Sequence, residues 1–193
     1  MPENAVKIQD AEGHNLSINS LGQISTSTAP EGSVMYGYGV FDAPGVVAAN
    51  NFLSLFNPVG SGKLLTVYRL TVYPFAGGAT TATASLQATR ITAASAGSLI
   101  AANTVSKFST MAANPVAEVR TTNPTVTTVG NPITVVPPAI TAAAAGISAA
   151  VQVQPPSGAA FVCQPGEGVV ARTPSGNVNQ LWSIFVTWGE SPL

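Results

Sequence analysis

The stretch that decides the fold is FLSLFNPVGSGKLLTVYRLTVY, residues 52–73. It predicts two β-strands, 52–56 and 64–73, joined by a tight polar turn. Side chains alternate along a strand, and β-branched and aromatic residues pack well on a pleated surface. We therefore expect Leu64, Thr66, Tyr68, Leu70 and Val72 on one face of the second strand, and Leu65, Val67, Arg69, Thr71 and Tyr73 on the other. Pro74 is expected to end this strand, because proline cannot donate to a ladder.

Segments of the same kind recur along the rest of the chain, separated by Gly and Pro turns. We expect further strands at 34–41, 80–92, 118–129, 133–136, 151–154, 160–163, 169–172 and 178–187. Pro124 predicts an edge or bulged strand at 118–129. Residues 139–150 (AITAAAAGISAA) are the one plausible helix, although Gly146 weakens that prediction. Many short strands without a convincing helix predict an all-β fold, a β-sandwich or jelly roll.

The first 31 residues differ from the remainder. Apolar residues recur there at short intervals but are too few for an independent core, so we expect a flexible extended arm or a small β-hairpin element that folds against something else. We expect the sandwich domain to occupy residues 32–193. The apolar residues of the first segment are Val6, Ile8, Leu16, Ile18, Leu21 and Ile24.

Charge is scarce in this chain. Charged residues make up 8% of the 193 residues, whereas a soluble domain usually has about a quarter. Such a surface is poorly protected against association, so either the protein is a monomer with a neutral polar exterior or much of its surface is buried in an oligomer or lattice. The net charge is −1 and the seven cations are scattered, which argues against a nucleic-acid partner. No apolar run predicts a signal peptide or a membrane span.

The sequence predicts no enzyme, cofactor or metal site. Residues 59–63 (VGSGK) resemble the end of a phosphate-binding loop, but the first Gly and the final Ser or Thr are missing. His14 lies in the turn-rich first segment, and Cys163 has no local basic partner to activate it. Glu118 and Glu167 are the nearest approach to a glycosidase pair, yet each sits at a turn-like boundary where solvation is the ordinary explanation.

Two sets of strand residues have alternative interpretations. Arg69 and Arg90 lie in mid-strand and are either exposed side chains or donors of intersubunit hydrogen bonds. The aromatic residues either fill the core, which we favour for Trp182, or line a sugar-binding groove, because rings offer flat apolar platforms with a polar handle. The candidates for such a groove are Tyr36, Tyr38, Trp182 and Trp188.

The order of these segments resembles a family of tailed-bacteriophage virion structural proteins of the capsid decoration, or cement, type. The resemblance rests on VKIQDAEGHNLSINSLGQI (6–24), NFLSLFNPVGSGKLLTVYRLTVY (51–73), LQATRITAAS (86–95), FVCQPGEGVVART (161–173) and WSIFVTW (182–188). It implies a jelly-roll domain that forms a homotrimer on the capsid exterior, with a terminal extension that helps to anchor it.

From this resemblance we expect a virion protein that is made in the host cytoplasm, binds the major capsid protein and stabilises the shell. The first segment, with Val6, Ile8, Leu16, Ile18, Leu21 and Ile24, is then the expected capsid or neighbour contact. The alternative is a receptor- or glycan-binding head-fibre or tail module that uses exposed aromatic residues such as Tyr36, Tyr38 or Trp188.

Overall fold

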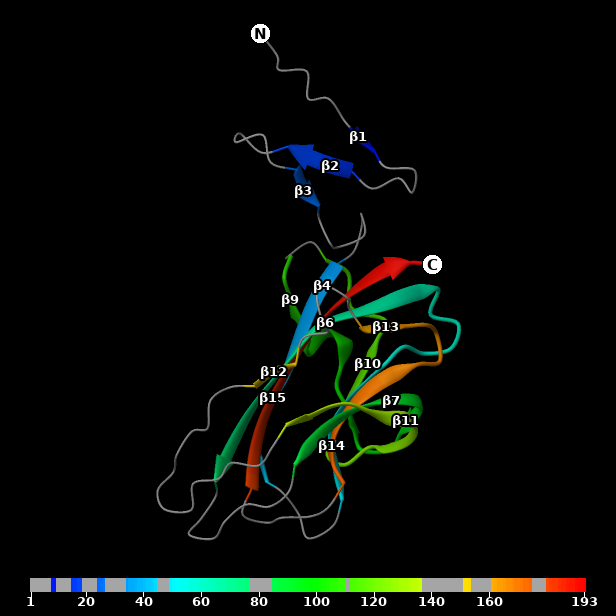
Figure 1. Ribbon diagram of the computed structural model, residues 1–193. Helices are drawn as coiled ribbons and strands as arrows, with labels where there is room; N and C mark the ends of the chain where they lie inside the picture. Colours follow the sequence, from blue (N-terminus) through cyan, green and yellow to red (C-terminus); the bar gives the residue numbers. More distant parts are fainter. Residues whose placement is uncertain are drawn as a thin grey trace.

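The computed structural model describes residues 8–9, 15–18, 24–26, 34–44, 49–76, 85–109, 112–136, 151–153, 161–174 and 180–193. Within these ranges the chain is almost entirely β, and the one helical element is a short 3-10 turn, η1 (Ala102–Thr104). Two antiparallel sheets pack against each other, which confirms the predicted all-β sandwich (Figure 1).

The first of the two layers, here called the β6 sheet, is organised around the stretch with which the sequence analysis began. Its order is β12-β6-β15-β4-β9, and β13 also pairs with β6. Its strands are β4 (Val34–Pro44), β6 (Lys63–Ala76), β9 (Ser106–Lys107), β12 (Val151–Val153), β13 (Phe161–Cys163) and β15 (Gln180–Pro192).

The second layer, the β5 sheet, has the order β11-β7-β14-β5-β10-β8. Its strands are β5 (Asn50–Phe56), β7 (Leu86–Ser95), β8 (Ser98–Leu99), β10 (Glu118–Thr121), β11 (Thr125–Val136) and β14 (Gly168–Thr173).

The pairing of the strands is nested. β4 pairs with β15, β5 with β14, β6 with both β12 and β13, and β7 with β11. The chain therefore behaves as one long antiparallel hairpin that is rolled up so that successive pairs fall alternately in the two sheets. This is the topology of a jelly roll, with the short elements β8, η1, β9 and β10 in the connection between β7 and β11.

A third, small sheet lies in the first segment of the chain. Its strands are β1 (Ile8–Gln9), β2 (Asn15–Ile18) and β3 (Ile24–Thr26). They pair antiparallel in the order β1-β2-β3, and within the described ranges they pair only with one another. The short strands predicted for residues 1–31 are therefore present.

The core lies between the two large sheets. Trp182 and Trp188 of β15 are fully buried, and the ring of Trp188 lies 5.7 Å from that of Tyr36 on β4. The core assignment of Trp182 is thus confirmed. Aliphatic side chains from both layers complete the core, among them Leu53, Leu55, Leu65, Val67, Val72, Leu86, Val119 and Ile184.

A β-bulge in β6 makes the predicted alternation wrong. Trp188 pairs with Val67 and its neighbour Thr187 pairs with Arg69, so Tyr68 is an extra residue in the ladder. Because an inserted residue shifts the pleat, the inward face changes from odd to even positions. The core side chains of β6 are consequently Leu65, Val67, Leu70 and Val72.

Proline has a different effect from the one expected in two places. β6 continues through Pro74 to Ala76 and pairs there with β15 alone. β12 covers the other edge of β6 only as far as Val72, so Pro74 lies at an edge position, which tolerates proline. The predicted single strand at 118–129 is instead two strands, with Pro124 in the turn between β10 and β11. β11 then runs on through 133–136, which was expected to be a separate strand. The possible helix at 139–150 lies outside the described residues.

Candidate functional site

The outer face of the β6 sheet carries aromatic rings that lie on glycine backbone. A Cβ atom added to Gly37 would lie 2.9 Å from Cζ of Phe185, and one added to Gly39 would lie 2.9 Å from Cδ2 of the same ring. A Cβ atom at Gly189 would lie 2.9 Å from Cε2 of Tyr68. Any side chain at these glycines would displace a ring, so the glycines allow the rings to pack against the sheet.

These rings belong to a partly exposed cluster that we call the aromatic face, in which Phe41, Tyr73 and Phe108 are exposed and Tyr68 and Phe185 are half-buried. Phe41 is 73% exposed and Phe108 is 62% exposed. Phe108 also lies beside Gly37, 3.4 Å from the position of an added Cβ atom. Large exposed apolar groups that gather on one sheet face are typical of an interaction surface.

A hollow of about 350 Å³ opens on the aromatic face, lined by Met35, Tyr68, Arg69, Phe108 and Thr187. Arg69 is exposed there, and its guanidinium forms no hydrogen bond or ion pair with any residue of the described ranges. The hydroxyl of Tyr68 is buried, again without a hydrogen-bond partner in the described part of the chain. The exposed Arg69 guanidinium can therefore donate to a partner that covers the face, whereas the Tyr68 hydroxyl is buried beneath it.

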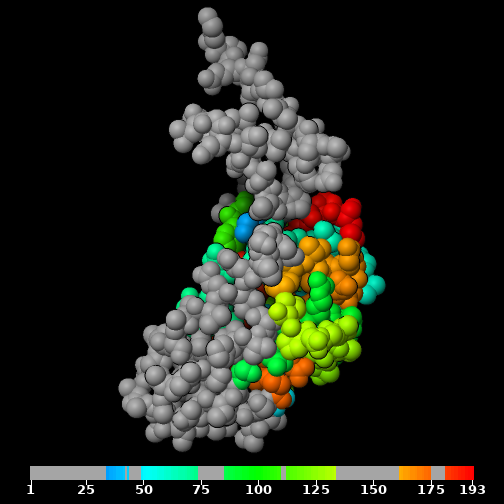
Figure 2. Space-filling model, in the orientation of Figure 1, coloured from blue at the N-terminus to red at the C-terminus, as the bar shows by residue number. Residues whose placement is uncertain are grey.

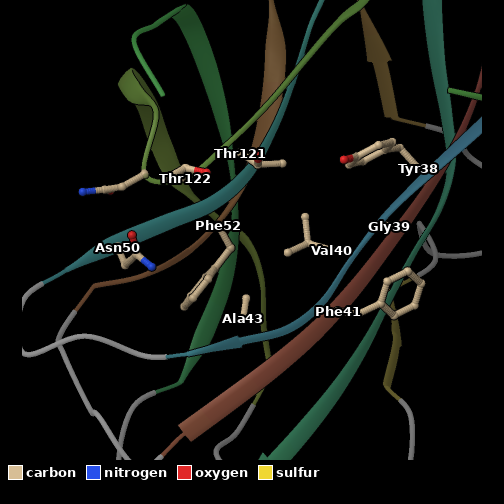
Figure 3. A pocket seen from close by; sticks show the side chains of 10 residues that line it. Tyr38, Gly39, Val40, Phe41, Ala43, Asn50, Phe52, Thr121 and Thr122 are labelled. Atoms are coloured by element: carbon tan, nitrogen blue, oxygen red, sulfur yellow. The ribbon is translucent and has the colours of Figure 1, made fainter. Parts of the chain in front are cut away.

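The second surface is a groove of about 600 Å³ between β4 and the β5 sheet (Figure 3). Tyr38, Val40 and Ala43 line it from β4, and Asn50 and Phe52 line it from β5. The turn after β10 closes the far side with Thr121, Thr122 and Asn123, and Phe41 lies at one end. None of the described residues that line this groove is charged.

The turn beside the groove has an unusual backbone. Thr122 has φ 59° and Asn123 has φ 55°, which is the left-handed region that β-branched residues avoid. The turn is held by its neighbours: the backbone N–H of Asn51 donates to Oδ1 of Asn123 at 3.0 Å, and Nδ2 of Asn51 donates to the Pro124 carbonyl at 2.8 Å. The Ser98 hydroxyl also donates to Oγ1 of Thr122 at 3.2 Å. This side of the groove is therefore fixed to β5.

The resemblance of residues 59–63 to a phosphate-binding loop is explained by a structural turn. Gly60 and Gly62 have φ of 79° and 64°, which is the left-handed region. Asn57 is 1% exposed, and its hydrogen bonds hold the turn in place. Its Nδ2 donates to the carbonyls of Lys63 at 2.8 Å and Cys163 at 3.0 Å. Its backbone also bonds to Gly166 and Glu167, so one asparagine fastens the 57–62 turn to the 164–167 turn.

Replacing Asn57 with Ala should leave both carbonyls without their side-chain donor. We expect the free energy of unfolding to fall by about 2 kcal/mol, the cost of unsatisfied buried acceptors. Urea denaturation measures this, with Asn103→Ala as the control, because Asn103 is exposed. Equal stability of the two variants would contradict the anchoring role of Asn57.

A buried carboxylate fastens the connection between β9 and β10 to the last strand. Glu190 of β15 is 5% exposed, and its carboxylate accepts from the backbone N–H groups of Val116 at 3.0 Å and Ala117 at 2.9 Å. Nε1 of Trp188 donates to it as well, at 3.3 Å. Burial, and then the charge of Glu190, raise the pKa of the Tyr36 hydroxyl, which donates to the Ala113 carbonyl at 3.0 Å.

The structure distributes the predicted site residues over several places. Ile8, Leu16, Ile18 and Ile24 lie in the small sheet, whereas Val6 and Leu21 fall outside the described residues. Arg69 lies on the aromatic face, and Arg90 lies elsewhere. Nη1 of Arg90 donates to the Val162 carbonyl at 3.3 Å and lies 3.7 Å from Oε2 of Glu167, so Arg90 already has partners within the chain.

Two of the aromatic residues proposed as an exposed sugar platform are buried. Tyr36 is 2% exposed and Trp188 is fully buried, because both side chains point into the core between the sheets. The prediction that they are exposed is therefore wrong. Tyr38 packs partly against the core, and of the three residues named for that role it is the one that lines the groove.

The remaining chemistry-bearing residues have local roles. Cys163 is buried, and this burial raises the pKa of its thiol to about 11, which keeps it protonated. Glu118 forms an ion pair with Arg120 at 2.8 Å, and Glu167 accepts from the backbone N–H of Gln164 at 3.0 Å. Among the described residues there is no group of acidic, His and Cys side chains that could hold a metal ion. No helix in those ranges could cross a membrane.

Sequence reasoning missed the aromatic face, Asn57 and Glu190. The spacing of glycine and aromatic residues in YGYGVF (36–41) was a usable signal, because small residues along one strand face leave room for rings from the neighbouring strand. Nothing local marks Glu190 as a link to the connection before β10, since its backbone donors there are 73 and 74 residues away.

No family model, curated protein or solved structure matches this chain.

Proposed function

We propose that this protein is a structural component of a tailed-bacteriophage virion, which decorates the capsid exterior as a homotrimer and stabilises the shell. The observation that carries the proposal is the aromatic face, with Phe41 73% and Phe108 62% exposed. Arg69 lies beside them and has no hydrogen-bond or ion-pair partner among the described residues. Covering such a surface removes apolar area from water, at about 25 cal/mol per Å². In a chain with only 8% charged residues, few ionised groups oppose that contact.

Threefold closure suits a surface of this kind. In a cyclic trimer each protomer uses two different patches, so the aromatic face of one copy packs against another surface of its neighbour. Arg69 then supplies hydrogen bonds across the interface, because arginine presents several donors in a rigid fork. Arg90 supplies them less readily, since it bonds to Val162 and Glu167 of its own chain.

Exposed apolar side chains also lie outside the aromatic face. Val129 of β11 is 48% exposed and Val162 of β13 is 37% exposed, and these strands lie at the surface shown in Figure 2. In a decorated particle, these apolar side chains could be covered by contact with the major capsid protein of the shell. A protein that binds only the assembled shell stabilises it by mass action, as any ligand of a native state does.

We assign the capsid contact to the first segment, which includes Ile8, Leu16, Ile18 and Ile24. The strands of this segment pair only with one another in the described part of the chain, so the segment is separate in its pairing from the sandwich. In this proposal the jelly-roll domain forms the contacts of the trimer, and the first segment attaches the trimer to the capsid.

Deleting residues 1–31 should therefore leave a trimer that no longer decorates capsids. The measurement is cosedimentation of the full chain and of the deletion variant with undecorated capsids, together with the mass of each protein in solution. We expect capsid binding to be lost and the trimer to be retained. Full occupancy by the deletion variant would show that the attachment assignment is wrong.

A second candidate function is that of a receptor- or glycan-binding head-fibre or tail module. The groove beside β4 favours it, since Tyr38 and Phe41 line that groove together with Asn50 and Thr121 and its described lining residues carry no charge. A glycan array compared with capsid cosedimentation distinguishes the two candidates.

A further inference from the structure

The groove between β4 and the β5 sheet has an aromatic ring and polar groups, and none of its described lining residues is charged. Phe41 is 73% exposed, so its ring is accessible at one end of the groove. The side chains of Tyr38 and Asn50 form no hydrogen bond with any residue in the described ranges. In Figure 3 the Tyr38 hydroxyl points into the space between the two layers.

These features select a class of ligand. A purely apolar occupant would remove water from the Tyr38 hydroxyl and the Asn50 amide without replacing the hydrogen bonds to that water, which costs free energy. A charged occupant would find no opposite charge among the described lining residues. A neutral sugar satisfies both requirements, because its hydroxyls bond to amide and hydroxyl groups while its C–H faces pack on aromatic rings.

The main alternative ligand is a peptide that adds a strand to β4, because beyond Gly37 the described chain leaves one edge of β4 unpaired. A bulge interrupts that edge: Val40 pairs with Ile184 and Ala43 pairs with Trp182, so β4 has one residue more than β15 between these pairs. An extra residue breaks the regular spacing of backbone donors and acceptors. Only a short run of β4 could therefore pair with a regular strand.

The backbone at the far side of the groove is consistent with a ligand site. Thr122, with φ 59°, is in a conformation that costs a β-branched residue free energy, and such residues cluster where ligands are held. Asn51 and Ser98 hold the turn in this state. The turn is therefore positioned before any ligand arrives.

We infer that this groove binds a short neutral oligosaccharide. Its volume of about 600 Å³ falls within the range of small-ligand sites. Phe41 provides the stacking surface, and Tyr38, Asn50 and Thr121 provide hydrogen bonds. The inference rests on the glycan-binding candidate, and a failed capsid cosedimentation leaves it standing. The two proposals share Phe41, which the aromatic face of the proposed trimer would cover.

The test begins with the full chain on an array of short neutral oligosaccharides of hexose and N-acetylhexosamine, with sulfated and sialylated counterparts. The array sugar that binds best is then titrated into the wild type, Tyr38→Phe and Asn50→Ser by calorimetry. We expect each variant to raise the Kd about 5- to 10-fold, as the loss of one hydrogen bond does. Both changes are small, and equal melting curves would show that the fold is intact.

Thr127→Ala is the matched control, because Thr127 is exposed on β11 and does not line the groove; its Kd should equal that of the wild type. The inference is overturned if no neutral sugar binds, if binding requires sulfate or sialic acid, or if Tyr38→Phe and Asn50→Ser bind as tightly as the control. Phe41→Ala should also weaken binding, because it removes the stacking surface, and unchanged affinity of that variant would likewise overturn the inference.

Discussion

Replacing Glu190 with Gln is expected to lower the free energy of unfolding by about 3 kcal/mol, which for a chain of this size lowers the Tm by roughly 6–12 °C. The carboxylate accepts from the backbone N–H groups of Val116 and Ala117 and from Nε1 of Trp188. All three donors reach Oε1, so an amide can keep that acceptor, but it loses the negative charge that strengthens these hydrogen bonds. Its NH₂ group would also face the Val116 N–H, which lies 3.0 Å from Oε2. The loss of charge and this contact between two buried donors account for the size of the effect.

Thermal and urea denaturation at a fixed protein concentration measure this change, since oligomerisation makes stability depend on concentration. Glu118→Gln is the matched control. Glu118 is partly exposed and pairs with Arg120, and breaking such a surface pair is expected to cost no more than about 1 kcal/mol. Equal stability of the two variants would mean that the Glu190 carboxylate does not hold the connection before β10.

Replacing Phe108 with Ser is expected to raise the dissociation constant of the trimer at least about 30-fold. Phe108 borders both the hollow on the aromatic face and the backbone of Gly37, which places it centrally on the proposed interface. An aromatic residue at such a position typically carries a large share of the binding energy. Because Phe108 is already 62% exposed in the single chain, its loss should leave the fold intact.

Sedimentation equilibrium over a range of concentrations measures the dissociation constant. The control is Val59→Ser, which removes an apolar side chain that is 84% exposed in the 57–62 turn, outside the aromatic face. The control should remain a trimer at concentrations where Phe108→Ser is monomeric. If both variants associate like the wild type, the aromatic face is not the interface.

The fold class could be predicted from the sequence because it depends on patterns that are local. Short runs of β-branched and aromatic residues between Gly and Pro turns gave most of the strands of both sheets. The inward faces could not be predicted along the whole of β6, because one extra residue at Tyr68 reverses the alternation and the strand pairing alone reveals it.

The candidate surfaces were harder to predict for the same reason. Trp188 and Tyr36 are residue types that often line sugar-binding sites, but their positions in the strands direct both side chains into the core. The groove gathers residues from β4, β5 and the turn after β10, which are far apart in the chain. Arg69 was identified as a possible intersubunit donor, whereas the rings around it were not grouped, because their common face depends on the pairing of β4, β6 and β15.

The central claim is that a charge-poor jelly roll associates with copies of itself on the outside of a capsid. Electron microscopy of tailed-phage particles purified from cells that produce this chain, labelled with a gold-conjugated antibody raised against it, tests this most directly. The account predicts label over the outer surface of the head, at positions that averaging resolves into threefold-symmetric protrusions. Label confined to the tail, or particles that carry none of the protein, would contradict it.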